Sequence, residues 1–136
     1  MNKRQFLASA LTAAAGTAGY ASSARAQTAP MAKIVFFFQR LPGMSFEDFS
    51  RYWREQHGPI GAAMPGVRKY IQNHAAATLD GSPPAYDGFA ELWFDDMESL
   101  QQALASPESQ AAMADSENFL DMERIQTLIV EEVPVV

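Results

Sequence analysis

The sequence predicts an α+β domain with the element order β-α-β-β-α-β and a four-stranded antiparallel sheet. Three observations support this prediction. Four short runs are rich in β-branched and aromatic residues, as strands are. Between them, helical segments begin at capping residues and continue with apolar residues spaced three or four apart. Gly, Pro and Asp separate the segments and indicate turns.

The first strand is predicted at residues 33–40, an apolar and aromatic run expected inside the sheet and covered on both faces. A helix then begins at its cap Ser45 and ends where Gly58 and Pro59 follow His57. Spacings of three, four and four place four side chains on one face of this helix. They are Phe46, Phe49, Trp53 and His57.

The remaining strands are predicted at 67–74, 88–94 and 125–133. In the second strand, Tyr70, Gln72 and His74 share one face. The third strand has a plain apolar face, expected against the helices, and a mixed face of Phe89, Glu91 and Trp93, expected toward a ligand. Helices are predicted after Asp96 and at Pro107, and residues 115–121 are predicted as loop.

This order of elements is the ferredoxin-like arrangement. Helices on one side of a four-stranded sheet leave its other face bare, and here that face carries aromatic residues. An exposed apolar face on a soluble domain normally meets a partner. We therefore expect a homodimer whose sheets pack face to face, with clefts between each sheet and its helices.

Residues 1–26 have the layout of a cleaved export signal, with Lys3 and Arg4 before an uncharged segment and a small-x-small site ending at Ala26. Residues 3–7 resemble the twin-arginine motif, with Lys3 in place of the first arginine, so the general secretory route stays open. Residues 27–32 are expected as a linker. The signal predicts a periplasmic protein without membrane insertion after cleavage, and a mature domain at residues 33–136.

Composition narrows the function classes. The signal holds three of the ten basic residues and none of the sixteen acidic ones, so removing it changes the net charge from −6 to −9. A domain this acidic is a poor candidate for binding nucleic acid. The chain has no cysteine and two histidines, which excludes disulfides and provides no spacing typical of a zinc or iron site. We expect neither metal nor cofactor.

The motifs together resemble the EthD-like family of dimeric α+β barrel proteins. The matching segments are the opening strand with its turn at 41–43, the helix at 49–57 with Gly58 and Pro59, the turn at 65–66, the strand at 70–74, and residues 86–88 running into 90–94. The resemblance covers nearly all of residues 31–136. It implies relatives with varied chemistry, including a methylmuconolactone isomerase, polyketide-type cyclases and proteins linked to ether degradation. More distant barrels are cofactor-free quinol monooxygenases or haem proteins, so the fold does not decide the activity.

His74 and Glu91 are expected on inward faces of adjacent strands, close enough for the carboxylate to orient the imidazole. Such a pair is suited to removing a proton beside a carbonyl and returning it elsewhere. The alternative is a pair of core polar groups that braces the sheet. His57 is expected as a second proton group at a cleft mouth, or as a cap for the last turn of its helix.

Substrate-binding candidates are the hydrogen-bonding Tyr52, Tyr70 and Gln72 and the apolar Trp53, Phe89 and Trp93. The leading hypothesis is a small exported homodimer that binds a hydrophobic oxygenated compound, such as a lactone, phenolic or polyketide-like molecule. It would perform cofactor-independent isomerase or dehydratase chemistry. The alternatives are a non-catalytic binding or stress-related module and a cofactor-free or haem-linked oxygenase.

Overall fold

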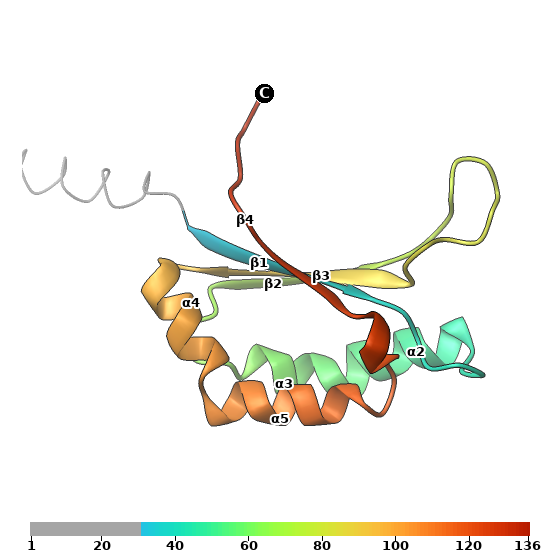
Figure 1. Ribbon diagram of the computed structural model, residues 1–136, viewed down its shortest axis with the longest axis horizontal. Coiled ribbons are helices and arrows are strands. Elements are labelled where there is room, and N and C mark those ends of the chain that lie inside the picture. Colours follow the sequence, from blue (N-terminus) through green and yellow to red (C-terminus); the bar gives the residue numbers. More distant parts are fainter. Residues whose placement is uncertain (1–30) are drawn as a thin grey trace, which may run out of the picture. The chain divides into compact units, whose positions relative to one another are not determined.

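A four-stranded antiparallel sheet with the strand order β2-β3-β1-β4 forms one layer of the protein, in a computed structural model that describes residues 31–136. The strands are β1 (Ala32–Phe38), β2 (Lys69–His74), β3 (Gly88–Phe94) and β4 (Gln126–Val130). The helices α2, α3, α4 and α5 lie on one side of this sheet (Figure 1). The predicted ferredoxin-like α+β fold is confirmed. The predicted export signal lies outside the described residues, as do residues 27–30 of the predicted linker.

The helical layer begins with α2 (Phe46–Tyr52), which runs directly into the π-helical segment η1 (Trp53–His57) and then into α3 (Gly58–Ala62). The second half of the chain provides α4 (Met97–Leu104), α5 (Pro107–Ser116) and the short 3-10 turn η2 (Met122–Arg124). No helix among residues 31–136 combines the length and the hydropathy that crossing a bilayer requires.

The sheet has a helix face and an outer face. Side chains that pair across the strands share a face, so Ile34 and Leu92 lie on the helix face together, and Val35 and Glu91 on the outer face. The helices cover the first of these faces only (Figure 1), although Val35, on the outer face of the internal strand β1, is also buried. The apolar members of the outer face are Val35, Phe37, Ile71, Phe89, Trp93, Leu128 and Val130.

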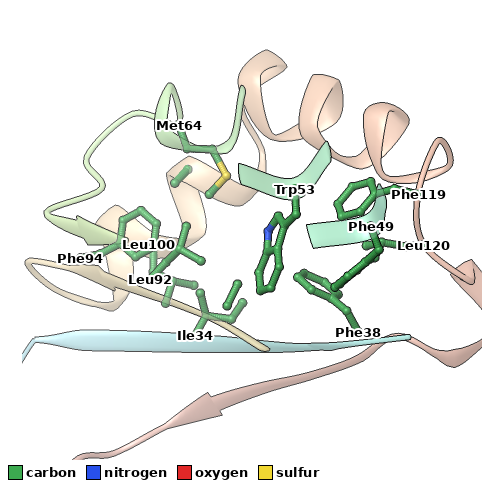
Figure 2. Close-up of a cluster of buried hydrophobic side chains, with 12 residues drawn as sticks. Ile34, Phe38, Phe49, Trp53, Met64, Leu92, Phe94, Leu100, Phe119 and Leu120 are labelled. Carbon is green, nitrogen blue, oxygen red and sulfur yellow. The ribbon is translucent and has the colours of Figure 1, made fainter. Parts of the chain in front are cut away.

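Trp53 is at the centre of the core between the helices and the sheet (Figure 2). It is fully buried, and its ring packs edge-on against Phe38 with the ring centroids 5.3 Å apart. The sheet accommodates this large ring at Gly88, where a Cβ atom would lie 2.6 Å from Trp53 Cζ3. Gly88 is therefore required by a close approach rather than by a turn.

The predicted helix end at Gly58 and Pro59 is wrong, because the chain continues helically through α3. The backbone widens into a π turn in which the Gly58 N–H donates to the carbonyl oxygen of Trp53. Pro59 then falls in the first turn of α3, just after the π turn, where proline is tolerated. The apolar face was predicted correctly, since Phe49, Trp53 and His57 are all buried. π turns of this kind are frequent at functional sites.

Candidate active site

A cavity of about 80 Å³ lies between the helix face of the sheet and the helices α3 and α5. This is room for a few water molecules or the core of a small organic ligand. Most of its wall is apolar, which favours an apolar ligand with few polar groups. The lining residues are Phe36, Phe38, His57, Gly61, Met64, Tyr70, Ala90, Leu92, Ser109, Ala112, Met113, Ser116, Ile125 and Thr127.

His57 is the one ionisable side chain of this wall that titrates near neutral pH. Its Nδ1 lies 2.8 Å from Oδ2 of Asp115, and the imidazole is buried. An ionised carboxylate only accepts hydrogen bonds, so Nδ1 carries the proton and donates it to Asp115. The other ring nitrogen, Nε2, is then an unprotonated acceptor, and it has no hydrogen-bond partner within residues 31–136. This arrangement suits a general base.

Asp115 is held by three donors. The Tyr52 hydroxyl donates to Oδ1 at 2.7 Å, the Asn118 amide donates to the same oxygen at 3.2 Å, and His57 donates to Oδ2. Burial raises the pKa of the Asp115 carboxyl, but the hydrogen bonds from Tyr52, His57 and Asn118 outweigh burial and leave its pKa below the ordinary value. Asp115 is therefore a stable anion that fixes the tautomer of His57.

Burial lowers the pKa of His57 below its ordinary value, although the hydrogen bond to Asp115 and its charge act in the opposite direction. The imidazole is consequently neutral at neutral pH, which is the form that accepts a proton. Tyr52, a predicted substrate-binding residue, instead contacts Asp115, and that hydrogen bond raises the pKa of the phenol. Its role is to hold the carboxylate.

Stability is expected to fall on acidification from about neutral pH, because the pKa values of His57 and His74 are both below the ordinary value of 6.5. As the pH falls through 6.5, the unfolded chain takes up protons that the folded protein still excludes, so the free energy of unfolding decreases. Denaturant titrations between about pH 8 and pH 5 measure this effect. A variant with glutamine at both histidines should show a flatter profile, and a wild-type free energy that rises toward low pH would contradict this prediction.

A second polar network surrounds Tyr70, which also lines the cavity. Its hydroxyl oxygen accepts a hydrogen bond from Trp53 Nε1 at 3.2 Å and another from Gln72 Nε2 at 3.2 Å. Gln72 Nε2 also donates to the carbonyl oxygen of Trp53 at 3.0 Å. Trp53 and Gln72, predicted to bind substrate, thus contact Tyr70. Trp53 belongs to the hydrophobic core and is not among the residues that line the cavity.

His74 uses both of its ring nitrogens within the protein. Nδ1 lies 2.6 Å from the Ser50 hydroxyl and Nε2 lies 2.9 Å from Gln72 Oε1. The ring also lies against Trp53, with centroids 4.4 Å apart. Burial, with a smaller contribution from the positive charge of Arg54, lowers the pKa of His74. No ring nitrogen of His74 is therefore left to contact a ligand.

The predicted pairing of His74 with Glu91 is wrong. Glu91 lies opposite Ile71 in the sheet and His74 lies opposite Gly88, and because the faces alternate along a strand the two side chains lie on opposite faces. Glu91 Oε2 instead lies 2.5 Å from Lys33 Nζ, and this hydrogen bond lowers the pKa of Glu91.

Phe89 and Trp93, both predicted to bind substrate, share the outer face with Glu91 and are not part of the cavity wall. Phe89 is exposed. Trp93 is buried beneath two ammonium groups, with Lys33 Nζ 4.4 Å and Lys69 Nζ 4.8 Å from the ring centroid. The expectation that the mixed face of the third strand meets a small ligand is therefore not met by the cavity, which lies on the helix face.

Asp115 was missed, because residues 115–121 were predicted as loop, whereas Asp115 is the second-last residue of α5. One signal in the sequence points to it. A carboxylate in the last turn of a helix lies at the negative end of the helix dipole, where anions are unfavourable. A residue that breaks such a local rule often has a function. Within residues 31–136, no group of three or more His, Cys, Asp or Glu residues is arranged to hold a metal ion.

Comparison with known proteins identifies the family. The model of the EthD domain matches residues 41–123, which is more than half of the chain. The chain belongs to the EthD domain family. An uncharacterised 11.0 kDa protein from the thcB-thcC intergenic region of Rhodococcus erythropolis is 35% identical over 71 residues, which cover 52% of this chain and 68% of that protein.

Solved structures of EthD-like and related proteins share the fold. An EthD family protein from Bacillus halodurans superposes with a TM-score of 0.66 at 24% identity, covering 76% of this chain and 99% of its own. A dimeric ferredoxin-like protein of unknown function from Thermobifida fusca gives 0.58 at 15% identity, covering 77% and 93%. SnoaB, a cofactor-independent oxygenase from Streptomyces nogalater, gives 0.58 at 13% identity, covering 79% and 98%. These likenesses establish a ferredoxin-like fold of the dimeric α+β barrel type.

Proposed function

We propose that this EthD-domain protein binds a small apolar compound carrying oxygen and moves a proton on it, with His57 as the general base. The observation that carries this proposal is the 2.8 Å contact between His57 Nδ1 and Asp115, at the wall of an apolar cavity. It leaves Nε2 as the proton acceptor on the side of the ring away from Asp115. The step is an acid-base reaction of the isomerase or dehydratase type and needs no cofactor.

His57 is a better base than His74, which the sequence favoured. Both nitrogens of His74 are hydrogen-bonded to Ser50 and Gln72, whereas His57 keeps Nε2 without a partner among the described residues. The lowered pKa of His57 and the anionic Asp115 also fit a base that works at neutral pH. Glu91 has no part in this site, because it lies on the outer face.

The test is a screen of lactones, phenols and cyclic ketones for conversion by the wild type, followed by His57→Gln. Losing the base is expected to lower turnover about 10²–10⁴-fold, the usual contribution of general base catalysis. The control is Arg51→Gln on the exposed side of α2, which should leave turnover unchanged. Equal turnover in wild type and His57→Gln would remove His57 as the base. Tight binding of a screened compound without conversion would favour the non-catalytic binding module.

We propose further that the mature protein is exported to the periplasm and is a homodimer joined through the outer face. The signal-like layout of residues 1–26 supports export. Exposed Phe89 and Leu128 lie on the outer face beside Val35 and Ile71, and an apolar face of this kind normally meets a partner. The Thermobifida fusca protein, which shares the fold, is described as dimeric, and this supports the dimeric state. Cell fractionation and sedimentation test the two parts separately.

A further inference from the structure

We propose that the Tyr70 hydroxyl is a fixed hydrogen-bond donor for an oxygen atom of the ligand, which makes enolisable carbonyl compounds the substrate class of this cavity. The inference rests on the proposed function, since it deals with the same cavity and assigns the partner of the His57 base. Tyr70 and His57 both line this cavity, and they come from different layers, β2 and η1.

The hydroxyl oxygen of Tyr70 accepts hydrogen bonds from two N–H groups. Trp53 Nε1 and Gln72 Nε2 both lie 3.2 Å from it. An indole nitrogen only donates, so the contact with Trp53 has one possible direction. With its oxygen engaged as an acceptor twice, Tyr70 has only its own proton left to give.

The orientation of Gln72 is fixed by its other contacts. Nε2 lies 3.0 Å from the carbonyl oxygen of Trp53, which only accepts, so this atom must be the amide nitrogen. Its two hydrogens are used on the Trp53 carbonyl and on Tyr70. Gln72 Oε1 then accepts from Nε2 of His74 at 2.9 Å. The direction of the hydrogen bonds at Tyr70 is therefore set by an indole N–H that only donates and a backbone carbonyl that only accepts.

His74 and Ser50 complete the chain of hydrogen bonds. Because His74 Nε2 donates to Gln72, its Nδ1 accepts, and the donor is the Ser50 hydroxyl at 2.6 Å. His74 is neutral in this scheme, in agreement with the lowering of its pKa by burial. His74 and Gln72 thus act as positioning residues that hold the tyrosine oxygen.

The proton of Tyr70 has no acceptor within residues 31–136, and the ring faces the cavity. Tyr70 is half-buried, and leaving its hydroxyl proton without an acceptor there is unfavourable, so an acceptor atom from a ligand or water is expected. Burial also raises the pKa of Tyr70, so the hydroxyl keeps its proton at neutral pH. The cavity therefore presents one proton acceptor, His57, and one hydrogen-bond donor, Tyr70.

This pair of groups matches the enolisation of a carbonyl compound. His57 Nε2 takes the proton from the carbon beside the carbonyl, and the electron pair of that C–H bond forms the C=C bond of an enolate. The carbonyl π electrons move to oxygen, which accepts the hydrogen bond from Tyr70. Returning the proton from His57 to this carbon or to a conjugated one restores the carbonyl and the neutral histidine. No oxidant or reductant is consumed.

The experiment measures binding of two probes, 4-nitrophenol and nitrobenzene, by equilibrium dialysis near neutral pH. The phenol offers an oxygen that resembles an enolate, and nitrobenzene has the same ring without this oxygen. Tyr70→Phe is expected to weaken the binding of 4-nitrophenol about 10-fold or more, the effect of losing a hydrogen bond to a charged oxygen. Nitrobenzene should bind to the wild type and to Tyr70→Phe with equal affinity. Gln72→Met should likewise weaken the binding of 4-nitrophenol relative to that of nitrobenzene.

Tyr86→Phe is the matched control, because the Tyr86 hydroxyl donates to Gln126 Oε1 at 2.8 Å and Tyr86 is not a residue of this cavity wall. It should leave both affinities unchanged. If Tyr70→Phe loses affinity for both probes equally, or for neither, the assignment of Tyr70 is overturned, while His57 is left as the proposed base. Failure of wild type to bind either probe would overturn the proposed function together with this inference.

Discussion

Replacing Asp115 with asparagine is expected to lower turnover about 10²–10⁴-fold, the range observed when general base catalysis is lost. The carboxylate accepts the Nδ1 proton of His57 and keeps Nε2 free to act as base. An asparagine has nearly the same shape but presents an NH₂ group as well as an oxygen. When the NH₂ group faces His57, Nδ1 becomes the acceptor and the proton moves to Nε2, which then no longer accepts.

Asp95→Asn is the matched control for this substitution. Asp95 forms an exposed ion pair with Arg68, at 2.7 Å between Oδ2 and Nη2, and it lies outside the cavity wall. An exposed pair of this kind contributes little to stability, so the control should keep both activity and fold. Circular dichroism of Asp115→Asn establishes that the fold is retained. Wild-type turnover in folded Asp115→Asn would contradict the assigned tautomer.

Replacing Trp53 with alanine is expected to lower the free energy of unfolding by about 3–5 kcal/mol, the range for deleting a large buried ring. Trp53 is fully buried and contacts the rings of Phe38, Phe49 and His74. Gly88, which is shaped around this ring, cannot fill the space that remains. Urea denaturation measures the loss, and a decrease below about 1 kcal/mol would contradict the central position given to this residue.

The second tryptophan provides a comparison of a different kind. Trp93 lies on the outer face, through which we propose the homodimer forms. Its replacement by alanine is expected to lower stability by an amount that depends on protein concentration, because it weakens association as well as packing. The decrease in stability caused by Trp53→Ala should not depend on protein concentration more than the stability of the wild type does. Concentration-independent melting of wild type and Trp93→Ala alike would contradict dimer formation through this face.

The fold was predictable because local patterns and tertiary packing agree. The alternation that places Tyr70, Gln72 and His74 on one face of β2 is present in the structure, as is the stripe of Phe49, Trp53 and His57 on one helix face. Both patterns follow from the period of the element itself. Element ends were less predictable. The helix crosses Gly58 and Pro59 because a π turn, in which the Gly58 N–H donates to the carbonyl oxygen of Trp53, replaces the usual hydrogen bonds.

The site was only half predictable, because strand register and helix packing decide which of its side chains meet. Sequence alternation assigns two faces to each strand but does not say which faces of two strands match, and this is why Glu91 was placed beside His74. The link between His57 and Asp115 joins η1 to α5 across 58 positions of the chain. No local spacing encodes it. The anionic residue at the negative end of α5 was the single local sign.

The most direct test of the central claim is the tautomeric state of the two histidines, read from ¹⁵N NMR shifts of the imidazole nitrogens near neutral pH. With only two histidines in the chain, His57→Gln assigns both rings. We predict that His57 is neutral and carries its proton on Nδ1, facing Asp115, and that His74 is neutral and carries its proton on Nε2, facing Gln72. A His57 ring protonated on Nε2, or doubly protonated at neutral pH, would contradict its role as the base of this site.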